Sequence, residues 1–150
     1  MVKLVVDEEH STRVRTYVFA PDQSWRLCTS YCFVEALGAL KLKNKRGELS
    51  DRSYIAGSRR LTRLVRDHSI ELLQGDFSSH GVFAEAERMV KAHNIDFLDA
   101  FQLISVKDSW PYLAPSSRPI LITADGDLSK AAEKEGIRSW YCRETHRPKY

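Results

Sequence analysis

The sequence predicts an α/β fold in which helices cover both faces of a parallel sheet. Short apolar segments of strand character alternate along the chain with longer segments whose apolar residues recur at helical spacing. The chain has 150 residues, 43% of them hydrophobic and 29% charged, which is the size and composition of one globular domain. No repeat or low-complexity segment interrupts this order. We therefore expect one domain over residues 1–142, followed by a polar, basic tail over residues 143–150.

The first half of the chain contains start and stop signals for three helices. Ser11 and Ser30 are expected N-caps, and Ser50–Asp51 opens a third helix. Pro21 stops the first helix, and Gly47 stops the second after a basic stretch that suits a helix C-terminus. The expected helices cover residues 12–19, 30–46 and 51 onward, and the expected strands cover residues 25–29 and 69–73.

The second half continues the alternation. A helix is expected to begin near Gly81, and a break at His93–Asn94 separates it from the next helix. The prolines and serines of residues 108–119 indicate a loop. We then expect a strand over residues 120–123, a helix over residues 128–134 that Gly136 ends, and a last strand over residues 137–142.

Three carboxylates lie in apolar segments of three different elements. Glu35 and Asp99 lie within apolar helical runs, and Asp125 ends the apolar strand that begins at Ile120. An unpaired carboxylate on a buried surface is unfavourable, and sites of parallel sheets form beyond the carboxyl ends of the strands. We therefore expect the three to converge on one acidic site that holds a divalent cation, which prefers oxygen ligands.

Ordinary structural roles are the alternative for the same aspartates. An acid early in a helix, such as Asp99, is stabilised by the helix dipole, and Asp96 has the position of a cap. Asp125 and Asp127 flank Gly126 as turn residues do, and Asp127 can cap the next helix. The residue types alone leave both interpretations open.

Three segments together resemble the PIN domain, a metal-dependent ribonuclease family that includes the VapC-type toxins of toxin–antitoxin pairs. The first is Thr29–Glu35 with the turn Lys45–Ser50, which looks like the family's second-acid segment. The second is Asn94–Leu103, which is similar to its third-acid helix at Asp99. The third is Leu121–Leu128, which is similar to its fourth-acid segment. The order and spacing of the three are more specific than any one of them, and the resemblance covers nearly the whole chain.

This resemblance implies a three-layer sandwich with a central, mostly parallel sheet. It also implies an endoribonuclease that uses Mg²⁺ or Mn²⁺ to hydrolyse RNA, with Glu35, Asp99 and Asp125 as metal ligands. Thr123 would hydrogen-bond a ligand or a bound water and so hold the ligands in place. The implied partners are the RNA substrate, a cognate antitoxin protein and a second copy of the chain. The helix with Tyr54, Ile55, Leu61 and Leu64 offers an apolar face for such a homodimer.

The family's first aspartate has two possible registers in this chain. In the favoured one, Val2–Ser11 resembles the family's first helix and the segment after it, so the first strand and its aspartate lie upstream of Met1. In the other, Lys3–Val6 is the first strand and Asp7 is the first carboxylate, at a short distance from Glu35 for the family. The favoured register leaves open a second function, a PIN-like module that binds RNA or a partner protein without cleavage.

The remaining features are less informative. A net charge of +3 permits a polyanionic partner without requiring one, and Arg59, Arg60, Arg63 and Arg66 suit either phosphates or solvent. The three cysteines are expected to be reduced thiols, and the histidines lack metal spacing. No apolar run has the length of a signal peptide or a membrane span, so we expect a cytoplasmic protein without a membrane partner. No glycine-rich nucleotide-binding loop is present.

Overall fold

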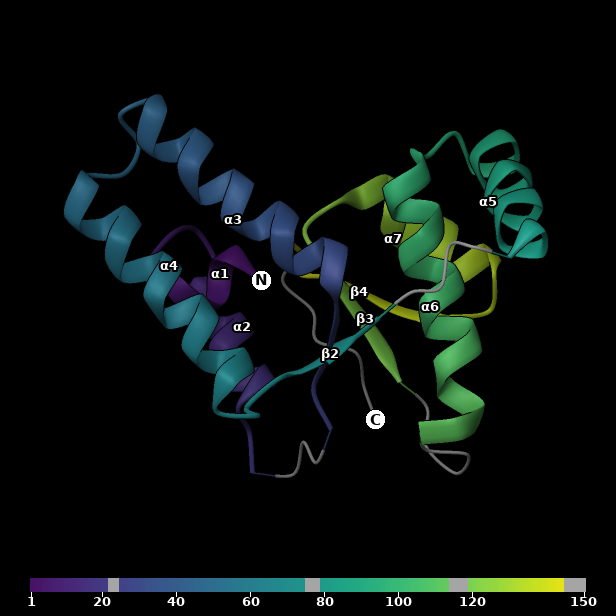
Figure 1. Ribbon diagram of the computed structural model, residues 1–150, viewed down its shortest axis with the longest axis horizontal. Coiled ribbons are helices and arrows are strands. Elements are labelled where there is room, and N and C mark those ends of the chain that lie inside the picture. Colours follow the sequence, from purple (N-terminus) through teal and green to yellow (C-terminus); the bar gives the residue numbers. More distant parts are fainter. Residues whose placement is uncertain (22–24, 75–78, 114–118, 145–150) are drawn as a thin grey trace. The chain divides into compact units, whose positions relative to one another are not determined.

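The computed structural model describes residues 1–21, 25–74, 79–113 and 119–144, and it divides the chain into two compact units, Met1–Gln74 and Gly75–Tyr150. Helices and parallel strands alternate in both units, which confirms the predicted α/β class (Figure 1). Within the described ranges, the strands form two separate two-stranded parallel pairs. The single central sheet of a three-layer sandwich therefore remains a prediction, as does the single domain over residues 1–142.

The described residues of the first unit form a parallel strand pair and four helices. Its elements are α1 (Val2–Val5), α2 (Ser11–Val18), β1 (Leu27–Thr29), α3 (Ser30–Lys45), α4 (Asp51–Arg66) and β2 (Glu71–Leu73). β1 pairs with β2 in the register Leu27 to Glu71. The helices α1, α3 and α4 pack against one another. Their buried apolar side chains, together with those of α2, form the core of this unit: Leu4, Val5, Val14, Tyr17, Leu40 and Leu61.

Gly57 allows α4 to approach the end of α1 and α3 closely. A Cβ atom at this position would lie 3.0 Å from Cγ1 of Val6 and 3.6 Å from Cδ2 of Leu40. Leu61, one helical turn further along the same face, is fully buried. The buried face of α4 is therefore defined by Gly57 and Leu61.

In the second unit, the part of the chain that the structure describes forms a parallel strand pair and three helices. Its elements are α5 (His80–His93), α6 (Phe97–Leu113), β3 (Ile120–Thr123), α7 (Gly126–Lys134) and β4 (Arg138–Tyr141). β3 pairs with β4 in the register Ile120 to Arg138, and α7 connects the two strands. Side chains of α5, α6, α7 and β4 form its core: Ala86, Met89, Ala100, Leu103, Ala132 and Trp140.

Most boundaries agree with the sequence-based prediction, including the helix stops at Gly47 and Gly136, whose φ angles are 76° and 77°. Two N-caps are predicted at the wrong residue. Thr29, not Ser30, caps α3 by accepting a hydrogen bond from the backbone N–H of Cys32 at 3.2 Å. Ser11 lies inside α2, where its hydroxyl donates to the carbonyl of Val6 at 3.0 Å.

The loop predicted over residues 108–119 is wrong over its first half. α6 continues to Leu113 and includes Pro111. Proline removes one intrahelical hydrogen bond and its ring crowds the carbonyl four residues upstream, and the helix ends two residues after Pro111. Residues 114–118 lie outside the described ranges, as do residues 145–150 of the predicted tail.

None of the helices in the described ranges is long and apolar enough to cross a membrane.

Candidate metal centre and its carboxylates

Asp125 lies where β3 ends and α7 begins. Its Oδ1 atom accepts hydrogen bonds from the backbone N–H groups of Asp127 at 2.8 Å and Leu128 at 3.0 Å. Asp125 is therefore the N-cap of α7, a role that the sequence had suggested for Asp127. The residue is exposed rather than buried. Because a carboxylate has two oxygens that can each accept hydrogen bonds, the cap leaves it with further acceptor capacity.

Thr123 lies two residues before this cap and is hydrogen-bonded to its backbone. Its Oγ1 atom accepts a hydrogen bond from the backbone N–H of Asp125 at 3.0 Å. This bond involves the backbone of Asp125, whereas the sequence-based prediction had Thr123 bound to a carboxylate or a water. Thr123 therefore orients the turn that carries the Asp125 carboxylate.

Asp96 and Asp99 lie at the start of α6. Oδ1 of Asp96 accepts a hydrogen bond from the backbone N–H of Asp99 at 2.9 Å, which confirms the capping position predicted for Asp96. Asp99 is half-buried in the first turn of the helix, next to the fully buried Ala100. A carboxylate in this position is stabilised by the helix dipole, so the position alone does not distinguish a structural acid from a ligand.

Glu35 lies in α3 and belongs to the first unit, whereas Asp99 and Asp125 belong to the second. Glu35 is exposed, and its neighbour Val34 is 65% exposed. The prediction of a buried surface around Glu35 is therefore wrong. α3 is apolar on all sides, so the sequence pattern did not reveal that its buried positions are Ala36 and Leu40. Glu35 is displaced from Ala36 by about 100° around the helix.

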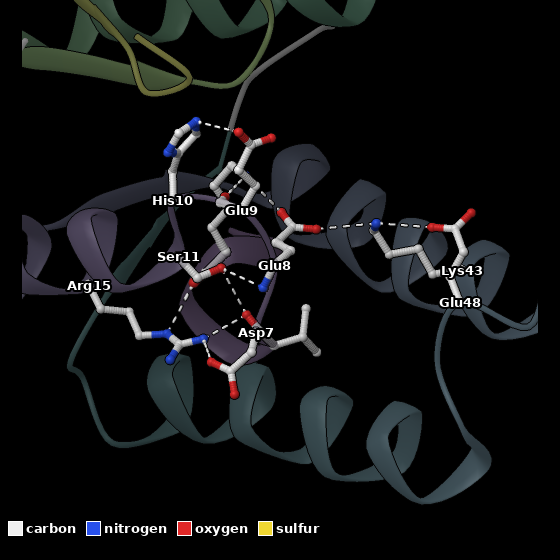
Figure 2. A network of polar contacts seen from close by, with 10 residues as sticks. Asp7, Glu8, Glu9, His10, Ser11, Arg15, Lys43 and Glu48 are labelled. Atoms are coloured by element: carbon white, nitrogen blue, oxygen red, sulfur yellow. Dashed lines mark hydrogen bonds and ion pairs between the residues drawn. The ribbon is translucent and has the colours of Figure 1, made fainter. Parts of the chain in front are cut away.

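Asp7 follows a helix and is paired with an arginine. Val2–Val5 is helical, so the register with a strand over Lys3–Val6 is wrong. The side chain of Asp7 is 93% exposed, and its Oδ1 atom lies 2.6 Å from Nη2 of Arg15, as Figure 2 shows. The observation that had favoured Asp7 as a first carboxylate, its place at a strand end, is therefore absent.

The acids directly after Asp7 are also ion-paired (Figure 2). Glu8 accepts from Lys3 at 3.1 Å and from Lys43 at 3.2 Å. Burial alone would raise the pKa of Glu8, but the hydrogen bonds from Lys3 and Lys43 lower it below its usual value. Lys43 also contacts Glu48 at 3.2 Å, and its two acidic partners raise its pKa. This network connects α1 and α3 and has the character of a structural contact.

A second network, centred on Glu135, had no signal in the sequence. Glu135 is the C-cap of α7, and its side chain is 9% exposed. Its Oε1 atom lies 2.7 Å from Nη2 of Arg88 and 2.7 Å from Nε2 of His93, and Oε2 lies 2.9 Å from Nζ of Lys107. Burial alone would raise the pKa of Glu135, but hydrogen bonds from His93, Lys107 and Arg88 lower it to about 2.

The Glu135 network offsets an unfavourable position. A carboxylate at a helix C-terminus meets the negative end of the dipole, and three donors from α5 and α6 compensate for it. The network therefore connects α5, α6 and α7. His93 is the last residue of α5, and its side chain is 8% exposed.

The chemistry of the three proposed ligands fits a hard cation. Glu35, Asp99 and Asp125 offer the oxygen atoms that Mg²⁺ and Mn²⁺ prefer. However, no group of three or more His, Cys, Asp or Glu side chains is gathered closely enough to hold a metal ion in the described ranges. The described residues therefore do not form a preformed metal cage.

Comparison with known proteins adds no identification. No family model matches the chain, and no curated protein or solved structure does.

Proposed function

We propose that this protein is an endoribonuclease of PIN type that hydrolyses RNA phosphodiester bonds, with Glu35, Asp99 and Asp125 as its essential carboxylates. The observation that carries the proposal is Asp125. It is an exposed carboxylate at the carboxyl end of a parallel strand, which is where open α/β folds form their sites. Asp99 belongs to the same unit and lies half-buried in the first turn of α6.

The residues around Asp125 would act by orienting this carboxylate. The N-terminal N–H groups of α7 fix its Oδ1 atom, and Thr123 fixes its backbone. A bound Mg²⁺ or Mn²⁺ would supply charge neutralisation at the phosphate and a water of lowered pKa. The residues proposed to hold this ion are Glu35, Asp99 and Asp125, and the three-layer sandwich is the form of the fold that accompanies this function.

The biological role that we propose is a cytoplasmic toxin restrained by a cognate antitoxin protein. A second function, a PIN-like module that binds RNA or a protein without cleavage, has a specific observation in its favour. Asp7, the alternative first carboxylate, is paired with Arg15. RNA binding without metal-dependent cleavage would favour this second function.

A pair of substitutions at Asp125 separates its capping role from the proposed catalytic role. Asp125→Ser retains an N-cap hydroxyl but removes the carboxylate, whereas Asp125→Ala removes both. We expect Asp125→Ala to lower the free energy of unfolding by about 1 kcal/mol and Asp125→Ser to change it by less than about 0.5 kcal/mol. Both variants should lose Mg²⁺-dependent cleavage of RNA. Full cleavage by the folded Asp125→Ser variant would reduce Asp125 to a cap and contradict the proposal.

We also propose a homodimer, on a smaller surface than the sequence suggested. Leu61, one of the four residues predicted to form the apolar face, is fully buried within the chain. Ile55 is 47% exposed, and Tyr54 and Leu64 are half-buried. Sedimentation equilibrium at micromolar concentration should give twice the monomer mass, and Ile55→Asp should lower it, because a charge at the centre of an apolar interface is unfavourable. A monomeric wild-type protein would contradict the dimer without affecting the ribonuclease proposal.

A further inference from the structure

Three arginines form one line along the outer face of α4. Arg52, Arg59 and Arg63 are all exposed, and we call them the arginine stripe. Successive residues of an α-helix are rotated by about 100°, so the three arginines lie within about 40° of one another around the helix axis. Along the axis they extend over about 16 Å. The same geometry puts Arg59 and Arg63 about 160° from Gly57 and Leu61 respectively, the residues that define the buried face of α4. The stripe is therefore directed away from the core.

The charges of the stripe are not neutralised by acids in the described ranges, where its three side chains have no ion pair or hydrogen bond. The neighbouring acids are engaged with other residues, because Asp51 accepts from Asn44 at 2.8 Å and Asp67 pairs with Arg66 at 3.1 Å. The helix as a whole carries five arginines and one aspartate. Cations of like sign on one helix face repel one another, so this face is suited to an external polyanion.

The chemistry of the stripe favours phosphates repeated along a strand. A guanidinium binds phosphate oxygens through two parallel hydrogen bonds. The stripe places its three arginines at intervals of about 10 Å and about 6 Å along the axis of α4. A nucleic acid backbone carries one negative charge per nucleotide along a line, and each phosphate that a protein neutralises releases counterions.

An exposed tryptophan lies near the end of the same helix. The chain that leaves α4 contributes His68 and Ser69 to a shallow depression that Trp25 and Glu71 also line. Trp25 is 55% exposed, so a large part of its side chain is accessible to a ligand. Aromatic side chains beside a basic surface stack on the bases of single-stranded nucleic acids.

We propose that the arginine stripe binds the phosphate backbone of single-stranded RNA and that Trp25 stacks on one of its bases. The choice of RNA rests on the proposed ribonuclease function, but the binding itself does not require cleavage or metal. The surface lies within the first unit, so it is complete without any residue of the second unit.

The test is fluorescence anisotropy of a labelled single-stranded RNA with the full chain in EDTA, over a series of KCl concentrations. The variant R52Q/R59Q/R63Q should reduce the slope of log K against log salt by about 2, because each phosphate contact contributes about 0.7. R52K/R59K/R63K should keep the wild-type slope. Trp25→Ala should weaken binding about tenfold at an unchanged slope.

The matched control is K91Q/K130Q/K134Q, which removes the same charge from exposed positions of the second unit and should leave the slope unchanged. A wild-type slope in R52Q/R59Q/R63Q would overturn the assignment of the stripe. Displacement of the RNA by polyglutamate at equal charge concentration would overturn it in favour of an acidic protein partner. Unchanged affinity in Trp25→Ala would overturn the stacking role. RNA binding without any cleavage in Mg²⁺ would leave the stripe intact and contradict only the ribonuclease proposal.

Discussion

Asp99→Asn is expected to abolish Mg²⁺-dependent cleavage of RNA. Asparagine keeps the size and polarity of the side chain but removes the negative charge that a metal ligand needs. Loss of a group that only orients a ligand lowers metal affinity or activity by about 10–100-fold, so loss of a ligand should reduce the cleavage rate by at least about 100-fold. The rate is measured on a labelled RNA with Mg²⁺ or Mn²⁺ and in EDTA.

The fold should tolerate this substitution. Asp99 lies in the first turn of α6 and is half-buried, where an acid contributes about 0.3–1 kcal/mol through the helix dipole. Urea unfolding of Asp99→Asn in EDTA should therefore give a free energy within about 1 kcal/mol of the wild type. A structural Asp99 predicts the reverse pattern, with a larger loss of stability and no specific effect on metal-dependent cleavage. Cleavage that survives in the folded variant would rule out Asp99 as a ligand.

Glu135→Gln is expected to lower the free energy of unfolding by about 1–2 kcal/mol at neutral pH. The pKa of Glu135 is lowered from 4.5 to about 2 in the folded protein, and each pKa unit corresponds to about 1.4 kcal/mol. The substitution leaves Arg88, His93 and Lys107 around a neutral side chain that is 9% exposed in the wild type. Arg88 and Lys107 are 47% and 38% exposed, so solvent screens both cations and the loss of stability is smaller than the full pKa shift would give. Urea unfolding monitored by circular dichroism measures the difference.

The pH dependence has a defined direction. Because the folded-state pKa of Glu135 lies below its unfolded value, the unfolded chain binds more protons between the two values, and stability rises with pH there. The contribution of Glu135 is fully present above about pH 4.5 and decreases as the pH falls toward 2. The difference between wild type and Glu135→Gln should therefore shrink by about half between pH 7 and pH 3.

Glu87→Gln is the matched control for this prediction. Glu87 lies in the same unit, with a side chain that is 59% exposed, and it contacts Lys91 at 3.7 Å. An exposed pair of this kind contributes about 0.5 kcal/mol or less. Equal effects of the two substitutions would show that the buried Glu135 network contributes no more than a surface ion pair.

The sequence predicted the helices and strands more accurately than it predicted which of their residues are buried. Short strands between turn residues and helix stops at glycine depend on neighbours in the sequence, so the four strands of the described ranges and the ends of α3 and α7 were placed correctly. The cap of α3 was displaced by one residue because Thr29 and Ser30 are equally suited to capping. α6 extends into the first half of the predicted loop and ends two residues after Pro111, so the proline did not mark the end of the helix as the prediction assumed.

The candidate site was less predictable because burial depends on residues distant in the sequence. The apolar neighbours of Glu35 suggested a buried surface, but which side of α3 is covered depends on α1 and α4, which pack against it. The Glu135 network joins residues 28 to 47 positions apart, and no local motif links them. The capping roles of Asp96 and Asp125 depend on neighbouring residues only. The sequence indicated the cap at Asp96 correctly, whereas it suggested Asp127 in place of Asp125 for α7.

The two strand pairs differ in the number of residues that lie between the paired strands in the sequence. The partners Leu27 and Glu71 of β1 and β2 are separated by two long helices, whereas Ile120 and Arg138 of β3 and β4 are separated by α7 alone. Loop-closure entropy grows with the logarithm of this number, so pairing β3 with β4 costs about 0.8 kcal/mol less chain entropy than pairing β1 with β2. Contacts between residues near in sequence also form sooner. The strand end that carries Asp125 therefore belongs to the pair whose assembly is entropically the easier of the two.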